Sequence, residues 1–442
     1  MLLDKNIIQN SKYPVATFKE MLNMQRGRFG HRPRNDPRYY GGEIPFIQTG
    51  NVVKASESNE KIEYNQTLNE LGLSTSRLFE SRVLVITIAA NIGYTAILDY
   101  PACFPDSLVA LTLKTEGDLS LEYVNVYIRM IRQYIENLAP QAAQKNINLK
   151  QLRKMPIIIP DKDTRKEIVS IMEAAYDEKI KKEQKAESLQ KSLDSYLLQA
   201  LDIEVHVEKK QDVEQRIFYL NESDLWGNRF DPEYHKPVFA ENLRNIEQGE
   251  YPTVTLKKIA KGGLIKGSLP HDNQRAGECK VIQISNINTD GTIEVFENTT
   301  SKFIYSPEQK LKKGDILVVI TGATIGKIGF WDYEGEYYLG GDIVKFNTGN
   351  YFLNEIYAAL LRTKPYQLQI RRCITGATNG HLSLKDLELL QLPYIMHEDV
   401  QENLTKYISA NRSKIRLLKQ DAKTVICDAK KQIEKMLWEK HL

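Results

Sequence analysis

The sequence contains two copies of one long pattern, about 235 residues apart. The segment Phe46–Val52 (FIQTGNV) returns as Val281–Ile287 (VIQISNI), and the strand-like run Val83–Ile86 returns as Ile316–Val319. This period is too long for one unit of a solenoid, which repeats every 20 to 50 residues or so. It indicates two copies of a whole domain, with internal pseudo-twofold symmetry, in a molecule that holds two similar things at once.

The two copies also begin and end alike. Tyr13–Lys19 (YPVATFK) opens the first copy, and Tyr251–Lys257 (YPTVTLK) opens the second. Near their ends, Gln144–Leu152 (QKNINLKQL) returns as Asn379–Leu387 (NGHLSLKDL). Short β-branched runs between these landmarks predict strands over residues 44–53, 83–88, 108–113, 280–287, 316–320 and 342–346. With helical segments expected over 120–135 and 354–373, each copy is predicted to be a mixed α+β domain with a curved or barrel-like sheet.

A long helix is predicted after each copy, over residues 163–201 and 398–437. Apolar residues recur there at steps of three and four, with charged residues between them, as in a coiled-coil seam. About 40 residues make roughly 60 Å of helix. Because one such helix cannot bury its seam alone, the simplest arrangement is an antiparallel pair with one domain at each end. A parallel pair joined by the connector 202–250 is the alternative.

Composition limits the kinds of site that the chain can carry. Its net charge is only +3 over 442 residues, so any basic surface must be local. Neither the histidines nor the cysteines have zinc-site spacing, so no structural metal is expected. No disulfide pattern, secretory signal or apolar run of about 18 residues occurs, so the cytoplasm is the expected compartment, with no membrane span.

No catalytic motif is convincing. Gly322–Ile328 superficially resembles a phosphate-binding loop, but it is too short between its glycines and lacks the Ser or Thr after Lys327. A tight turn between two strands is the favoured interpretation, since Ala89–Tyr94 of the first copy lacks the lysine. Asp36–Tyr40 is a poor match to the amino-methyltransferase loop, because the second proline is missing. Dinucleotide, serine-hydrolase and zinc-protease motifs are also missing, which favours a binding protein over an enzyme.

An arginine-rich loop over residues 25–40 is the strongest functional signal. Five arginines and one aspartate lie in a segment broken by glycine and proline and followed by Tyr39 and Tyr40. Arginine offers forked donors to phosphates and guanine edges, and aromatic rings can pack against sugars or bases. A solvated loop is the alternative interpretation. The matching zone of the second copy, 261–275, is also basic but differs in sequence, as two readers of different DNA sequences would require.

Polar and basic side chains at corresponding loops complete the predicted DNA surface. Amide side chains can pair bidentately with adenine, although polar residues at strand ends more often cap backbone groups. The candidates in the first copy are Arg26, Arg28, Arg32, Arg34, Gln48, Asn51, Gln144, Lys145 and Asn146. Those in the second copy are Lys266, Arg275, Gln283, Asn286, Thr324, Lys327, Thr378, Asn379 and His381. No catalytic, cofactor-binding or metal-binding residue is predicted in this chain.

The order of these motifs resembles that of the DNA-specificity subunit of type I restriction–modification systems. The likeness covers essentially the whole chain, including its duplication, and Ile316–Gly326 and Leu382–Leu387 are its most similar segments. The first copy departs more from the family, with Ile88-Ala89 aligned to Thr321-Gly322 and Lys166 in place of the glutamine found as Gln401 in the second helix.

The resemblance implies two target-recognition domains, 1–160 and 251–396, each reading one half of a split asymmetric DNA site. It also implies that the helices 161–201 and 397–442 form an antiparallel coiled coil, set the gap between the half-sites and dock two methyltransferase subunits. Residues 202–250 would be a linker or strap. A motor-nuclease subunit is a further implied partner, and S-adenosylmethionine is expected only in the partners. The alternatives are a scaffold protein or, less favoured, a stand-alone methyltransferase or nuclease.

Overall fold

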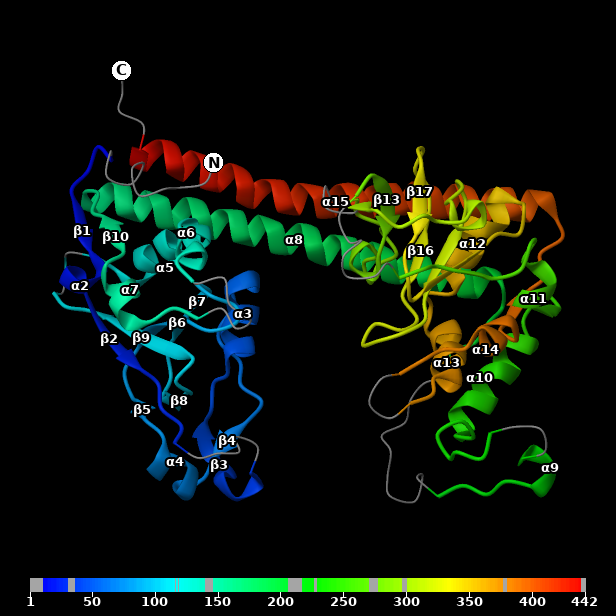
Figure 1. Ribbon diagram of the computed structural model, residues 1–442, viewed down its shortest axis with the longest axis horizontal. Helices are drawn as coiled ribbons and strands as arrows, with labels where there is room; N and C mark the ends of the chain where they lie inside the picture. The colour runs from blue at the N-terminus through cyan, green and yellow to red at the C-terminus, as the bar shows by residue number, and fades with distance from the viewer. Residues whose placement is uncertain are drawn as a thin grey trace. The chain divides into compact units, whose positions relative to one another are not determined.

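The computed structural model describes residues 11–30, 36–115, 117, 119–139, 146–205, 217–225, 229–269, 277–295, 300–376 and 380–438 (Figure 1). They form two compact units. The first unit comprises Met1–Gln184 and Leu418–Leu442, and the second comprises Lys185–Leu417. The two long helices each contribute one part to both units, because α8 covers Lys162–Ala200 and α15 covers Glu398–Trp438.

An antiparallel sheet of order β2–β9–β6–β7 lies at the centre of the first unit, and its inner strand β6 is buried throughout. The strands of this unit are β1 (Val15–Thr17), β2 (Leu22–Arg26), β3 (Tyr40–Pro45), β4 (Thr67–Leu68), β5 (Leu78–Phe79), β6 (Val83–Thr87), β7 (Thr95–Leu98), β8 (Ala102–Cys103), β9 (Leu108–Leu113) and β10 (Pro156–Ile158). Its shorter helices are α2 (Phe18–Met21), η1 (Pro37–Tyr39), α3 (Thr49–Ser58), α4 (Glu70–Thr75), α5 (Leu121–Met130), α6 (Arg132–Asn137) and α7 (Leu149–Arg153).

The second unit repeats this sheet as β12–β18–β15–β16. Its strands are β11 (Thr253–Thr255), β12 (Ile265–Lys266), β13 (Cys279–Ile282), β14 (Thr300–Ser301), β15 (Ile316–Val319), β16 (Ile328–Phe330), β17 (Tyr337–Leu339), β18 (Ile343–Phe346) and β19 (Gln391–Pro393). Its shorter helices are α9 (Glu222–Leu225), α10 (Pro237–Glu247), α11 (Leu256–Ile259), η4 (Ile284–Asn286), η5 (Pro307–Gln309), α12 (Tyr351–Leu360), α13 (Lys364–Cys373) and α14 (Leu384–Glu388). The predicted duplication of a mixed α/β domain is therefore confirmed at the level of strand order.

A second, smaller pairing is also shared. In each unit the opening segment pairs antiparallel with the short strand before the long helix, β1 with β10 and β11 with β19. Within the described residues the two larger sheets are open, with β2 and β7 or β12 and β16 at their edges, so the barrel-like closure that the sequence suggested is not seen.

The strand predicted over residues 44–53 is wrong in its second half. The strand β3 ends at Pro45, and α3 begins at Thr49. The reason is a capping arrangement at Gln48, whose backbone N–H donates to the Asn51 side-chain oxygen at 2.8 Å. The run predicted over 280–287 ends in the same way, since Gln283 caps the short helix η4 through Asn286. A local hydrogen bond thus overrides the strand preference of the neighbouring β-branched residues.

The two long helices pack against each other as an antiparallel pair, as predicted. In the first unit, Ile168 and Met172 of α8 share an apolar cluster with Ile433 of α15, whereas Lys182, further along α8, pairs with the earlier residue Asp421 at 3.6 Å. In the second unit, the rings of Tyr196 and Tyr407 lie 3.9 Å apart. Residues further along α8 therefore contact residues earlier in α15, which excludes the parallel alternative.

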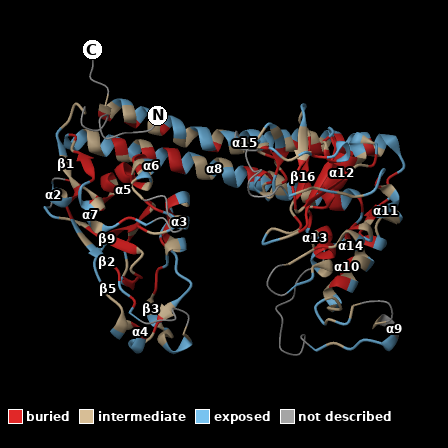
Figure 2. Ribbon diagram, in the orientation of Figure 1, coloured by how far each residue is buried: buried red, intermediate tan, exposed pale blue. Residues whose placement is uncertain are grey.

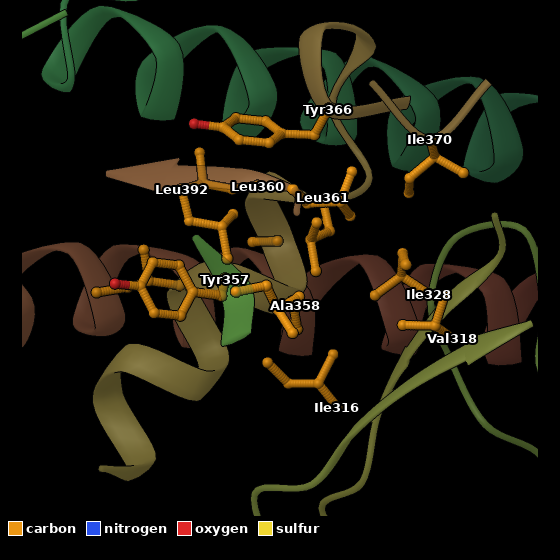
Figure 3. Packing of buried hydrophobic residues seen from close by; sticks show 14 of the residues in the cluster. Ile316, Val318, Ile328, Tyr357, Ala358, Leu360, Leu361, Tyr366, Ile370 and Leu392 are labelled. Atoms are coloured by element: carbon orange, nitrogen blue, oxygen red, sulfur yellow. The ribbon is translucent and has the colours of Figure 1, made fainter. Parts of the chain in front are cut away.

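Both units have an apolar core beneath the helices, which Figure 2 shows as buried segments of the sheets, of α5 and of α12. Figure 3 shows this packing in the second unit, where Ile316 and Val318 of β15 belong to one cluster with Ala358 and Leu361. Several of the abundant tyrosines are core residues. The Tyr357 hydroxyl donates to the Pro393 carbonyl at 2.9 Å, and burial raises the pKa of this phenol.

A buried ion pair distinguishes the second sheet from the first. The Lys345 ammonium lies 2.9 Å from Asp315, and their side chains are 5% and 3% exposed. Lys345 also donates to the Lys310 carbonyl, while Asp315 accepts from the Lys312 N–H and from Asn347, each at 2.9 Å. The strand registers place the buried apolar residues Val83 and Ala110 at the equivalent positions of the first sheet.

The turn after β6 contains a left-handed residue that is not glycine. Ala90 has φ +60°, and Gly322 in the turn after β15 has φ +83°. The Ile147 N–H donates to the Ile88 carbonyl, and the Leu382 N–H donates to the Ile320 carbonyl. These matched bonds align Ala89-Ala90 with Thr321-Gly322, so the sequence alignment with Ile88-Ala89 was wrong by one residue.

Replacing Ala90 with Gly is expected to raise the free energy of unfolding by about 0.5 to 1 kcal/mol. A left-handed conformation costs an L-residue about 1 to 2 kcal/mol, and glycine loses part of that gain through its more flexible unfolded chain. Thermal unfolding would show it as a Tm about 2 °C higher. The matched control is Gly322→Ala, where no atom lies within 4 Å of an added Cβ, so only backbone strain should lower the Tm. A lower Tm for Ala90→Gly would contradict this account.

Candidate nucleic-acid interface

The arginine-rich loop of the first copy starts at Gly27, where the backbone passes very close to the segment Phe104–Leu108. Arg26 ends the edge strand β2, and Gly27 follows it with its N–H bonded to the Leu108 carbonyl. A Cβ on Gly27 would collide with the carbonyl oxygens of Phe104 and Pro105, so only glycine fits there. Arg26 and Arg28 are exposed, and the Arg26 guanidinium also donates to the Asp106 carbonyl. The predicted contacts Arg32 and Arg34 lie outside the described residues.

The aromatic residues of this loop form a small core instead of an exposed stacking surface. Phe29 is only 3% exposed, and its ring centroid lies 5.1 Å from that of Phe46 and 5.9 Å from that of Tyr40. Tyr39 meets Phe29 edge-on. Burial of this aromatic cluster anchors the loop to Tyr40 of β3 and Cys103 of β8.

The second copy has the same crossing at Lys266-Gly267. Lys266 ends the edge strand β12, and the Gly267 N–H donates to the Ile343 carbonyl, as Gly27 does to Leu108. A Cβ on Gly267 would collide with the Gly340 carbonyl. Lys266 is exposed, so each copy presents one cation at this position, whereas the predicted contact Arg275 lies outside the described part of the chain.

The four amide candidates divide into exposed and capping residues. Gln48 and Gln283 are exposed at the starts of α3 and η4. Asn51 and Asn286 cap these helices with their side-chain oxygens, and the Asn286 amide nitrogen also donates to the Glu294 carbonyl at 2.6 Å. Asn286 is fully buried, so its side chain faces the protein in this structure. The capping interpretation therefore describes the asparagines, whereas Gln283 is exposed and the exposed Gln48 donates its amide N–H to the Gln66 side chain.

A third pair of loops lies against the turns that follow β6 and β15. Asn146 forms a bridge with Ala89, and His381 forms the matching bridge with Thr321. Asn146 is exposed and His381 is half-buried. The neighbouring candidates Gln144, Lys145, Thr378 and Asn379 fall in segments that the structure does not describe.

The glycine-rich segment Gly322–Lys327 is a turn between β15 and β16, which supports the turn interpretation over a phosphate loop. The Gly326 N–H donates to the Val319 carbonyl, and the Lys327 N–H to the Thr324 carbonyl. The Lys327 ammonium donates to the Ile287 carbonyl at 3.1 Å, so both Thr324 and Lys327 are held at a fixed place on the unit.

Sequence reasoning missed a basic residue beside the first loop. The Arg77 guanidinium, just before β5, donates to the Arg26 carbonyl and so joins the arginine cluster. Arg77 is distant in sequence and has no repeat partner in the matched motifs, so only the fold brings it near Arg26.

An arginine connects each domain to a long helix. In the first unit this arginine belongs to the domain, and in the second unit it belongs to the helix. In the first unit, Arg129 of α5 lies over the ring of Tyr176 of α8 at 5.1 Å, and burial lowers the pKa of its guanidinium. In the second unit, Arg412 belongs to the helix α15 and pairs with Glu355 at 3.1 Å and with Asp332 at 2.9 Å. Burial raises the Glu355 pKa, while Arg412 acts to lower it.

Further chemistry is limited in the described residues. Among them, no group of three or more His, Cys, Asp or Glu side chains could hold a metal ion. Cys103, Cys279, Cys373 and Cys427 are free thiols. Within the same residues, no helix is long and apolar enough to cross a membrane.

Known structures of low sequence identity resemble this chain over nearly its full length. A type I restriction–modification S subunit from M. genitalium is 14% identical, with 99% of both chains covered and a TM-score of 0.45. An HsdS subunit from Thermoanaerobacter tengcongensis is 12% identical over 96% of this chain and 95% of that chain, with a TM-score of 0.33. A chain from a type I R-M system, solved in a study of complex assembly and conformational transition, is 12% identical over 96% of both chains, with a TM-score of 0.47.

The family comparison agrees with the duplicated fold. The family model described as "Type I restriction modification DNA specificity domain" matches residues 10–191 and again residues 249–425. The two matches cover both copies of the repeat and most of both long helices. The chain therefore belongs to the DNA specificity family of type I restriction–modification systems, whose members are non-catalytic DNA-recognition subunits.

Proposed function

We propose that each copy of the repeat reads one half of a bipartite DNA site. The recognition domains are assigned to residues 1–160 and 251–396, the helices to 161–201 and 397–442, and the linker to 202–250. As a family member, the chain recognises DNA and works with methyltransferase subunits. We further propose two methyltransferase subunits per chain, which bind S-adenosylmethionine, and a motor-nuclease subunit as an additional partner. The cytoplasm, where the DNA lies, is the proposed compartment.

The observation that carries this proposal is the equivalence of the two loop origins. Arg26-Gly27 and Lys266-Gly267 leave equivalent edge strands through the same kind of backbone crossing. The loops that follow differ in length and sequence. Two domains that recognise different half-sites need the same scaffold with different loops. Contacts to phosphates position a protein on DNA, whereas contacts to bases select the sequence.

A protein scaffold is a weaker explanation of the same features. It would account for the two long helices, which give partner subunits a surface. It would not account for an exposed cation at the same strand end in both copies, followed by loops with different polar residues. We therefore assign Arg26, Arg28 and Lys266 to phosphate or base contacts, together with the exposed amides Gln48 and Gln283.

A domain graft tests the bipartite reading. A foreign recognition domain placed over residues 251–395, with acids kept at the positions of Asp332 and Glu355, is expected to change one half of the methylated site only. The two acids preserve the anchor to Arg412 on α15. The measurement is a comparison of methylated sequences in cells carrying the original or the grafted chain with the same methyltransferase subunit.

The reciprocal graft over residues 12–160 is the matched control, and it should change the other half-site. A graft that alters both half-sites would contradict independent reading. A graft that folds, assembles and leaves the methylated site unchanged would show that the second copy does not read DNA sequence.

A further inference from the structure

Two hollows lie side by side on the second unit, between the β15–β16 turn and α13. Their volumes are about 320 Å³ and 340 Å³, and they share Ile325 and Gln367 in their walls. Gln367 joins the two elements, because its amide nitrogen donates to the Gly326 carbonyl at 2.9 Å and to the Leu361 carbonyl at 2.6 Å. The two neighbouring hollows, which meet at Ile325 and Gln367, are together called the α13 groove below.

The charged side chains in the walls of the α13 groove are all cationic. Lys327 and Arg362 line one hollow, Lys364 and Arg371 line the other, and no carboxylate lines either. Arg371 is exposed, and Lys327 is held in place by its bond to the Ile287 carbonyl. Cations on a fixed scaffold are suited to a polyanion, because little order is lost when it binds.

Arg362 lies deeper than the other three cations. Its Nε is buried and has no hydrogen-bond partner, while Asp194 and Asp290 interact with its charge. A Cβ on Gly291 would collide with its guanidinium. Because these acids offset Arg362, the positive potential that reaches an incoming ligand comes mainly from the outer cations, of which Lys364 and Arg371 are exposed.

The equivalent surface of the first unit has different side chains. Gly93 packs against Arg132 just as Gly326 packs against Gln367, which places α6 where α13 lies in the second unit. Arg132 lies 4.5 Å over the ring of Tyr94 and pairs with Glu136 at 3.9 Å. At this place in the first unit Arg132 is therefore engaged by Tyr94 and Glu136, and Lys430 of α15 is a second cation near it.

We propose that the α13 groove binds the sugar–phosphate backbone of duplex DNA next to the half-site read by the second copy. This inference rests on the proposed function and adds a contact surface to it. Lys327 and Arg371 would each neutralise one phosphate, and Gln367 keeps the groove open by holding α13 to the turn. Because the groove contacts phosphates, it adds affinity without sequence preference.

The test uses the complex of the full chain with its methyltransferase subunit and a duplex that contains the methylated site. Affinity is measured over a range of salt concentrations for the wild type, Arg371→Glu and Lys327→Gln. The slope of log K against log salt is negative, and each lost phosphate contact makes it less steep by about 0.9. We expect that loss in each variant, with the methylated sequence unchanged. Arg371→Glu tests the idea without disturbing the fold, because the side chain is exposed.

Arg132→Ala is the control, since it removes the cation that stands at the position of Gln367 in the first unit, and it should leave the slope unchanged. Unchanged slopes in both α13 groove variants, beside a wild type that still binds its site, would overturn the groove and leave the proposed function intact. Binding of inorganic phosphate to the groove with unchanged DNA slopes would reassign it as a free-phosphate site. A wild-type complex without specific DNA binding would overturn the proposed function and the groove together.

Discussion

Removing one turn from both long helices is expected to shorten the spacer of the recognised DNA site by one or two base pairs. Deleting Lys182–Lys185 from α8 and the facing Leu418–Asp421 from α15 removes no buried residue and takes out both members of the Lys182–Asp421 pair. Four residues of helix span about 6 Å. At about 3.4 Å per base step, that length is nearly two base pairs. Sites of the original spacing should lose methylation, while both half-sites keep their sequence.

The matched deletion matters because the two helices are antiparallel. A deletion in α8 alone would put its two ends out of register with α15, so that Tyr196 could not face Tyr407 while Ile168 still packs with Ile433. Deleting four residues from both helices overwinds the pair locally but keeps the partners opposite each other. The measurement is the set of methylated sequences in cells. A folded, assembled variant that still methylates only the original spacing would show that the helices dock partners without setting the gap.

Replacing Lys345 with Ala is expected to lower the free energy of unfolding of the second unit by about 3 to 5 kcal/mol, since it leaves Asp315 buried without its cation. Thermal unfolding would show a Tm lower by roughly 10 °C. Lys313→Ala is the control, because Lys313 is 50% exposed beside Asp332 and Glu334. Exposed pairs of this kind contribute at most about 1 kcal/mol.

The first sheet suggests how the loss at Lys345 can be reversed. The double variant Asp315→Val with Lys345→Ala copies the Val83 and Ala110 of the first sheet, and it removes the buried charge entirely. It should recover most of the stability that Lys345→Ala loses, apart from the bonds of Asp315 to Lys312 and Asn347. A double variant as unstable as the single one would mean that these polar bonds, and not the unpaired charge, cause the loss.

The sequence alone predicts those elements of the fold whose burial leaves a regular apolar pattern in both copies of the repeat. The runs at β6, β9 and β15, and the seams of α8 and α15, were readable because burial on a strand or helix face leaves a regular pattern. The start of α3 was not, because one bond between Gln48 and Asn51 decides between helix and strand. The left-handed Ala90 was hidden for a similar reason, since the surrounding turn imposes its conformation.

The candidate site was less readable than the fold. The arginine-rich loop is visible because its charges are neighbours in sequence, and the basic zones of the two copies make Arg26 and Lys266 candidates. Arg77 is isolated in sequence and Arg371 has only Arg372 beside it, and both reach the surface in question only through packing. The asparagines Asn51 and Asn286 show the opposite problem, because their repeat marks a shared helix cap as clearly as it would mark a shared base contact.

The opposed arginine anchors have a consequence for how such a chain can acquire new specificities by recombination. Tyr176 follows Ile168 and Met172 in steps of four, as Arg412 follows Leu404 and Ile408, so the two anchors occupy matching places on their helices. A crossover that put the first copy onto α15 would bring Arg129 beside Arg412, two cations without an acid between them. A recognition domain inherited from another chain should therefore fit only the copy, first or second, whose long helix carries the matching anchor residue. Crossovers should be tolerated where a domain travels with its own helix segment, and hybrids with two facing arginines should show a lowered Tm.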